Sequence, residues 1–160
     1  YLEVITRKTA VLFAAACHGA ALLGDYDQQT RQRQHDFGLN LGIAFQMIDD
    51  VLDYEGDPAA MGKNIGDDLT EGKPTLPLIF TLANGTDSEQ ALVHDAISNK
   101  SADHMDEIIV AVERCGALDY TRNQARHYHD LALASLEHLP ASPYRSALAD
   151  ITALSINRDR

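Results

Sequence analysis

The segment from Phe45 to Tyr54 places three carboxylates, those of Asp49, Asp50 and Asp53, within five residues of an otherwise apolar run. Residues three or four apart lie on one face of an α-helix, so these carboxylates share a stripe with Gln46. Like charges at these spacings repel one another, and a hard divalent cation would relieve that repulsion. The pattern therefore indicates either a metal-binding face or an acidic face in solvent.

A loop rich in glycine and lysine follows this acidic stripe, from Gly62 to Pro77. Its candidate functional residues are Gly62, Lys63, Gly66, Asp67, Gly72 and Lys73. The glycines permit backbone conformations that let main-chain N–H groups approach an anion, and the lysines supply the positive charges that hold phosphates. Asp67 could take a metal-bound water or orient a lysine. An ordinary solvated turn is the alternative, but the position of the loop directly after the acidic stripe favours a phosphate site.

Composition and pattern predict an all-α fold for the 160 residues, with 45% hydrophobic and 23% charged residues and no strand-like alternation. One domain of this length can bury roughly two-thirds of its unfolded surface. Helices are expected at residues 1–23, 27–54, 76–82, 87–98, 102–115, 117–139 and 143–156. Thr86 and Glu89 have the spacing of a capping box, and Ser142 before Pro143 is typical of a helix start.

The net charge of −11 argues against nucleic acid or an anionic membrane as a partner, because both would repel the protein. It does not exclude a small anionic substrate, which needs only a local positive pocket or a bridging metal. Cys17 and Cys115 lack metal-ligand spacing, and we expect buried, reduced thiols rather than a disulfide.

The first predicted helix is rich in small residues, which would allow close packing in the middle of a bundle. Its apolar run from Ala10 to Leu23 is too short to span a bilayer. Lys8 and Thr9 precede that run; Lys8 either extends to the surface or faces an anion site. We also expect exposed apolar surface along this helix, for instance at Val11 and Leu12.

These motifs together resemble those of the trans-type polyprenyl diphosphate synthases, most closely the octaprenyl diphosphate synthase group. The matching segments are Lys8-Thr9-Ala10, Phe45-Gln46-x-x-Asp49-Asp50-x-x-Asp53, Gly62-Lys63-x-x-Gly66-Asp67-Asp68-x-x-Glu71-Gly72-Lys73-x-Thr75-Leu76-Pro77 and the terminus Arg158-Asp159-Arg160. A lone DDxxD motif would be weak support, but the combination is highly specific.

The resemblance implies an all-α isoprenoid-synthase helical bundle whose cavity holds an allylic diphosphate through Mg²⁺. It assigns metal binding to Asp49, Asp50 and Asp53, with Asp67 acting through water. It assigns diphosphate binding to Lys8, Lys63 and Lys73. The catalytic residues it implies are Lys8, Thr9, Gln46 and Lys63, of which the Thr9 hydroxyl, the Lys8 carbonyl and the Gln46 amide would face the allylic cation.

The activity implied is elongation of an allylic diphosphate, such as farnesyl diphosphate, with isopentenyl diphosphate units. Its product would be a long-chain polyprenyl diphosphate for isoprenoid or quinone side-chain biosynthesis. The resemblance further implies a cytoplasmic homodimer whose lipid product can contact a membrane.

Nothing in the sequence matches the first aspartate-rich motif of the family. We therefore expect residues 1–160 to be the C-terminal part of a single polyprenyl synthase domain, inactive without the N-terminal half. The alternative in another class is a non-catalytic helical subunit that dimerises with or regulates a complete synthase. A terpene cyclase on the same fold is a third possibility, which the Gly-Lys-x-x-Gly-Asp loop disfavours.

Overall fold

The computed structural model describes residues 1–55 and 66–158, and the regular structure in these ranges is helical, which confirms the all-α prediction. In chain order the elements are α1 (Leu2–Ile5), the π-helical turn η1 (Thr6–Ala10), α2 (Val11–Leu23), α3 (Gln28–Glu55), α5 (Asp67–Thr70), α6 (Leu76–Asn84), α7 (Asp87–Asn99), α8 (Met105–Arg114), α9 (Ala117–Leu136) and α10 (Pro143–Ile156). Within the described ranges, none of these helices combines the length and the apolar character needed to cross a membrane.

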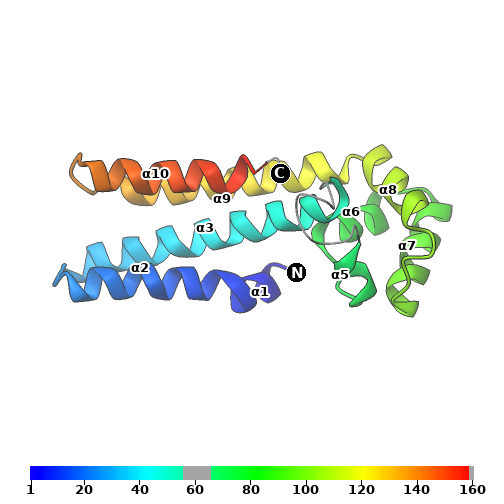
Figure 1. Ribbon diagram of the computed structural model, residues 1–160, viewed down its shortest axis with the longest axis horizontal. Helices are drawn as coiled ribbons and strands as arrows, with labels where there is room; N and C mark the ends of the chain where they lie inside the picture. The colour runs from blue at the N-terminus through cyan, green and yellow to red at the C-terminus, as the bar shows by residue number, and fades with distance from the viewer. Residues whose placement is uncertain (56–65, 159–160) are drawn as a thin grey trace. The chain divides into compact units, whose positions relative to one another are not determined.

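The chain forms two compact units. Helices α3 and α9 are each divided between them, with one part of each helix in unit 1 and the other in unit 2. Unit 1 comprises Tyr1 and residues Asp49–Asn123, and unit 2 comprises Leu2–Ile48 and Gln124–Arg158. In unit 2, α2, the first part of α3, the second part of α9 and α10 run alongside one another (Figure 1). In unit 1 the shorter helices α5 to α8 follow the end of α3.

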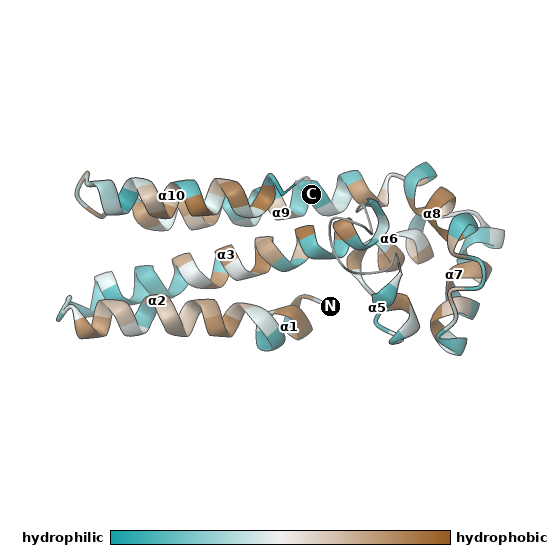
Figure 2. Cartoon of the chain, in the orientation of Figure 1, coloured by the Kyte–Doolittle hydropathy of each residue, from teal (hydrophilic) through white to brown (hydrophobic). Residues whose placement is uncertain are grey.

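Each unit has its own apolar core. The core of unit 2 is built on Phe37 and Leu41 from α3 with Ala132 and Leu136 from α9. The core of unit 1 contains side chains from α5 to α8 that are fully buried, namely Leu69, Leu78, Val93, Ile108 and Val112. The first turns of α3 are hydrophilic and its middle is more hydrophobic (Figure 2), so a single helix reaches from a polar start into both cores.

Two glycines of α3 let this helix approach α2 and the preceding turn η1 closely in unit 2. A Cβ atom at Gly38 would lie 2.4 Å from the carbonyl oxygen of Phe13, and one at Gly42 would lie 2.6 Å from the Cα atom of Ala10. Real Cβ atoms are not found at such distances from backbone atoms. Any larger residue at either position would therefore have to push the two helices apart.

The predicted helix ends are mostly confirmed. Thr86 and Glu89 form a capping box at the start of α7, and the Ser142 hydroxyl accepts a hydrogen bond from the Arg145 N–H at the start of α10. The structure differs at the first helix, which contains a π-helical turn, and at the glycine loop, which contains the short helix α5. Helix α8 also begins later and α9 ends earlier than expected.

Surface exposure bears out one expectation and corrects another. Val11 and Leu12 are 50% and 75% exposed, as predicted for the first helix. The expectation of buried thiols is wrong, because both Cys17 and Cys115 are free but partly exposed. Burial still raises the pKa of the Cys17 thiol, so that it stays protonated at neutral pH.

Replacing Glu89 with glutamine is expected to reduce the loss of folding stability that occurs as the pH becomes acidic. The Arg114 guanidinium, followed by the Thr86 N–H, lowers the pKa of Glu89 to about 2. Because this value lies below that of a glutamate in an unfolded chain, about 4.3, the ionised carboxylate stabilises the fold above that pH. This contribution is lost as the pH falls towards 2, and thermal melting between pH 2 and 7 will measure it. Equal acid sensitivity of Glu89→Gln and the native chain would contradict the assignment, and the exposed Glu113→Gln is the control.

Candidate functional site

The acidic stripe lies at the end of α3, in the part of this helix that belongs to unit 1. Asp50 is only 2% exposed and Asp53 only 7%, while Asp49 is partly exposed. The Tyr1 hydroxyl donates a hydrogen bond of 2.5 Å to Asp50 Oδ2. Burial, together with the charge of Asp50, raises the pKa of the Tyr1 phenol, so that it remains a hydrogen-bond donor at physiological pH.

The backbone after the stripe is tied to the glycine loop and to the start of α6. The Gly66 N–H donates to the Asp53 carbonyl oxygen at 3.2 Å. The Tyr54 and Thr75 hydroxyls are 3.1 Å apart and hydrogen-bonded, and burial raises the pKa of Tyr54. These two contacts fix both ends of the described part of the loop against the helix that carries the carboxylates.

The loop itself depends on glycine where the chain turns. Gly66 precedes α5 with a φ of 83°, and Gly72 follows α5 with a φ of 72°, a region of backbone conformation that favours glycine. Asp67 and Asp68 occupy the first turn of α5 between them, where a helix N-terminus favours negative charge. Asp67 thus lies on a helical turn rather than in an open loop.

Lys73 lies beside two carboxylates. Its Nζ atom is 2.9 Å from Asp68 Oδ1 and also forms an ion pair with Glu71. Hydrogen bonds from Lys73 to Glu71 and then to Asp68 raise the pKa of Lys73. The lysine is therefore fully charged at neutral pH, and any anion that binds it would compete with these two acids. The other predicted loop lysine, Lys63, lies outside the described residues, as does Gly62.

In unit 2 the π-helical turn carries the other predicted residues of the first helix. Thr9 is partly exposed, and its hydroxyl donates to Gln46 Oε1 at 2.9 Å. Lys8 is exposed. π-helical turns of this kind occur frequently at functional sites, because the extra residue changes which side chains a helix presents. The structure thus places Thr9 and Gln46, two of the predicted site residues, in contact with each other.

The residue before Gln46 is held by a cation from the end of the chain. The Arg158 guanidinium lies 4.0 Å above the centre of the Phe45 ring, and its Nη2 donates to the Phe45 carbonyl oxygen at 3.4 Å. Phe13 packs against the same ring, with 5.5 Å between the ring centres. These contacts fix the backbone from which the Gln46 side chain extends.

The carboxylates fit a metal that takes only part of its ligands from protein. Across residues 1–55 and 66–158, no group of three His, Cys, Asp or Glu side chains is arranged to hold a metal ion. Neighbours on a helix such as Asp49 and Asp50 point about 100° apart, so that three of them cannot readily converge on one ion. Mg²⁺ commonly uses one or two carboxylates, with waters and substrate phosphates completing its shell, and this stripe can supply such a set.

A family comparison decides what kind of protein this is. The polyprenyl synthetase family model matches residues 1–114. The chain belongs to the polyprenyl synthetase family. The octaprenyl diphosphate synthase of Escherichia coli (strain K12) is 41% identical over 161 residues, covering 100% of this chain and 50% of that protein. An all-trans-nonaprenyl-diphosphate synthase of Rhodobacter capsulatus is 42% identical over 158 residues, covering 99% of this chain and 48% of that protein.

The solved structures agree with this assignment to the polyprenyl synthetases. A polyprenyl synthase from Caulobacter crescentus CB15, complexed with calcium and isoprenyl diphosphate, matches with a TM-score of 0.94 and 39% identity. That match covers 100% of this chain and 49% of the other. The chain has the isoprenoid-synthase helical fold, and it spans about half the length of the curated relatives it matches.

Tyr1, Asp68 and Glu71 shape this candidate site, although none of them was assigned a role from the sequence. Tyr1 contacts Asp50 across 49 positions of sequence, and Asp68 and Glu71 pair with Lys73. The order Asp-Asp-x-x-Glu-x-Lys in the loop was a signal for the lysine pairing, because short loops bring such charges together. No local pattern marks the contact of Tyr1 with Asp50.

Replacing Tyr1 with phenylalanine is expected to destabilise the chain by about 1.5 kcal/mol, the lower end of the usual range for a hydrogen bond to a charged group. Urea unfolding of Tyr1→Phe, Asp50→Ala and the double variant will measure the coupling between the two side chains. Tyr144→Phe is the matched control, because Tyr144 is 83% exposed. Additive effects of the two single replacements would show that the hydrogen bond contributes nothing.

Proposed function

We propose that this chain is the C-terminal half of a prenyl diphosphate synthase that elongates an allylic diphosphate with isopentenyl diphosphate units. Its product would be a long-chain polyprenyl diphosphate, as the names of the octaprenyl and nonaprenyl relatives describe for those proteins. The observation that carries the proposal is the acidic end of α3, joined through the Asp53 carbonyl to a glycine loop that bears charged Lys73. The protein would act in the cytoplasm as a homodimer, with its lipid product able to contact a membrane.

The proposed site divides its work between two kinds of residue. Asp49 would be the direct ligand of Mg²⁺, Asp50 and Asp53 would orient it and its waters, and Asp67 would act through water. The metal would supply positive charge against the diphosphate. Lys8, Lys63 and Lys73 would bind the diphosphate and stabilise the negative charge that grows on it as the allylic carbon–oxygen bond ionises. The calcium and isoprenyl diphosphate in the Caulobacter crescentus structure support such a pairing of cation and anion.

The carbon chemistry needs little more from the protein. The Thr9 hydroxyl and the Gln46 amide, already in contact, would direct oxygen dipoles at the allylic cation. The double bond of isopentenyl diphosphate attacks that cation, a carbon–carbon bond forms, and a proton then leaves the neighbouring carbon. The released diphosphate accepts this proton, so no side-chain base is required.

A non-catalytic role is the second candidate. The chain covers 50% of the E. coli synthase, and half of a synthase could serve as a helical subunit that dimerises with or regulates a complete one. Such a subunit would change the rate of an intact synthase without contributing ligands of its own.

One experiment separates these roles. The chain is joined to the N-terminal half of the E. coli octaprenyl diphosphate synthase, and this product is called the complemented enzyme below. We expect it to convert farnesyl and isopentenyl diphosphates into long-chain products only when Mg²⁺ is present, while the chain alone shows no turnover. An inactive complemented enzyme that folds, together with altered rates when the chain is added to intact E. coli synthase, would favour the regulatory subunit.

Replacing Lys73 with glutamine is expected to change the stability by less than about 0.5 kcal/mol, since partly exposed ion pairs contribute little. In the complemented enzyme the same change should raise the KM for the allylic diphosphate roughly tenfold, the effect of losing about 1.4 kcal/mol of binding. Arg7→Gln removes another exposed ion pair, that with Glu3, and is the control. An unchanged KM in the Lys73 variant would remove this lysine from the proposed site.

A further inference from the structure

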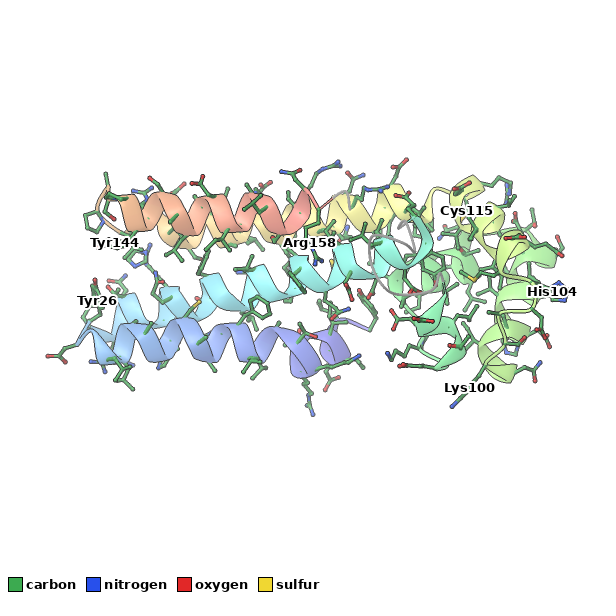
Figure 3. The ribbon with its side chains drawn as sticks, in the orientation of Figure 1. Tyr26, Lys100, His104, Cys115, Tyr144 and Arg158 are labelled. Atoms are coloured by element: carbon green, nitrogen blue, oxygen red, sulfur yellow. The ribbon has the colours of Figure 1, made fainter. Side chains whose placement is uncertain are left out.

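A cavity of about 330 Å³ lies in unit 2, where the α2–α3 turn meets the α9–α10 turn. Its apolar wall includes Leu139 and Leu148, and its rim carries Tyr26 and Tyr144. Figure 3 labels both tyrosines, which lie at the ends of their helix pairs. A cavity of this size is at the small end of the range for ligand sites in proteins. None of the residues that line it takes part in the proposed reaction.

One buried donor of the cavity, on Gln34, lacks an acceptor. Gln34 lines the cavity, and the Gln34 Nε2 atom is buried without a hydrogen-bond partner. Arg145 also lines it and uses Nη1 to donate to the Leu139 carbonyl oxygen at 2.9 Å, which fixes the guanidinium at the cavity wall. Buried donors normally find acceptors, so a ligand that brings oxygen atoms would complete this site.

The charge of the cavity is opposite to that of the protein. The chain carries 24 acidic residues and a net charge of −11, yet the described lining contains Arg145 and no carboxylate. The nearest acids in sequence are already engaged: Asp25 pairs with Arg31, and Asp27 accepts hydrogen bonds from Thr30. A guanidinium of this kind suits a phosphate or carboxylate group.

We propose that this cavity binds a small anionic amphiphile. Its phosphate or carboxylate head would accept hydrogen bonds from Arg145 and Gln34, and its short hydrocarbon body would lie against Leu139 and Leu148. The ligand is a free small molecule that enters past Tyr26 and Tyr144. This inference does not depend on the proposed function, since no metal ligand or reacting group is involved.

The chain contains its own reporter for this site. Cys17 lines the cavity, whereas Cys115 lies in unit 1, where its Sγ atom is 3.3 Å from the Thr81 hydroxyl. Both thiols are free. A ligand in the cavity will shield Cys17 from alkylation and leave Cys115 unaffected, so each sample carries an internal control.

The test uses the 160-residue chain, octyl phosphate below its micelle concentration and N-ethylmaleimide at mildly alkaline pH. Peptide mass spectrometry follows alkylation at each cysteine. At a concentration about four times its Kd, octyl phosphate should slow alkylation of Cys17 about fivefold, because only a fifth of the sites remain empty. Inorganic phosphate and 1-octanol, which carry the head and the tail separately, should protect far less.

Variants decide whether the named donors are responsible. Arg145→Gln and Gln34→Leu should each lose most of the protection, while Arg145→Lys keeps part of it and Arg126→Gln, an exposed site on α9, keeps all of it. If Arg145→Gln fails to fold by circular dichroism, Gln34→Leu alone carries the test. Equal protection by 1-octanol, equal protection of Cys115, or unchanged protection in Gln34→Leu would overturn the proposal. Protection by phosphatidylglycerol vesicles but not by monomeric octyl phosphate would also overturn it, in favour of a lipid headgroup.

Discussion

Replacing Asp49 with alanine is expected to lower kcat/KM of the complemented enzyme at least about 100-fold, a loss of roughly 2.7 kcal/mol of transition-state stabilisation. Asp49 is the only partly exposed carboxylate of the stripe within the described end of α3, because Asp50 and Asp53 are buried. It is therefore the carboxylate best placed to enter the shell of a metal that approaches from solvent. Initial rates with labelled isopentenyl diphosphate over a range of Mg²⁺ concentrations measure the effect.

The same series distinguishes a ligand from a structural residue. Loss of a ligand should raise the Mg²⁺ concentration needed for half-maximal rate, whereas unfolding would lower the rate at every concentration. Asp150→Ala, an exposed acid on α10, is the control and should leave both quantities unchanged. If Asp49→Ala keeps more than about a tenth of the rate, equivalent to a loss below 1.4 kcal/mol, the role proposed for Asp49 is wrong.

Replacing Gly38 with alanine is expected to destabilise unit 2 by about 1–2 kcal/mol. The added Cβ would lie 2.4 Å from the Phe13 carbonyl oxygen and 2.9 Å from the Ala14 Cα atom, and neither backbone atom can move without shifting α2. Overpacking of this kind costs about 1–3 kcal/mol, and the better helix propensity of alanine returns only part of it. Chemical unfolding followed by circular dichroism measures the change.

Gly19→Ala provides a control for which the expected change in stability has the opposite sign. Gly19 lies inside α2, and a Cβ there would meet no atom within 4 Å. Alanine at this position should stabilise the chain by about 0.5–1 kcal/mol, through helix propensity alone. A stabilising Gly38→Ala would mean that the close approach of α2 to α3 is not a tight contact.

Helix starts and ends were predictable where a side chain or a glycine marks them locally. Thr86 and Glu89 satisfy each other's backbone groups, and Ser142 before Pro143 starts α10, so both signals depend on residues within one turn. The positions of Asp49, Asp50 and Asp53 on one helix also followed from periodicity. Thr9 and Gln46 were singled out through the family resemblance, but their contact with each other became visible only in the structure.

Other features depend on contacts between distant segments, which no local pattern records. The burial of Asp50 beneath Tyr1, the stacking of Arg158 on Phe45 and the partial exposure of Cys17 are all set by packing. The pairing of Lys73 with Asp68 and Glu71 changes the chemistry expected of that lysine, because its positive charge is already engaged by two carboxylates. The role of Gly38 as a contact residue became visible only once α2 was placed against α3.

The π-helical turn at Thr6–Ala10 determines in which direction the preceding side chains point around the axis of the first helix. Its wider turn accommodates about one residue more than an α-helical turn, so residues before Thr6 are rotated by roughly 100° from where an uninterrupted α-helix would present them. Deleting a single residue there would leave the segment helical and its composition nearly unchanged. It would nevertheless rotate the side chains before Thr6 about the helix axis, so a gap of one position in an alignment of this helix corresponds to roughly a quarter-turn of those side chains.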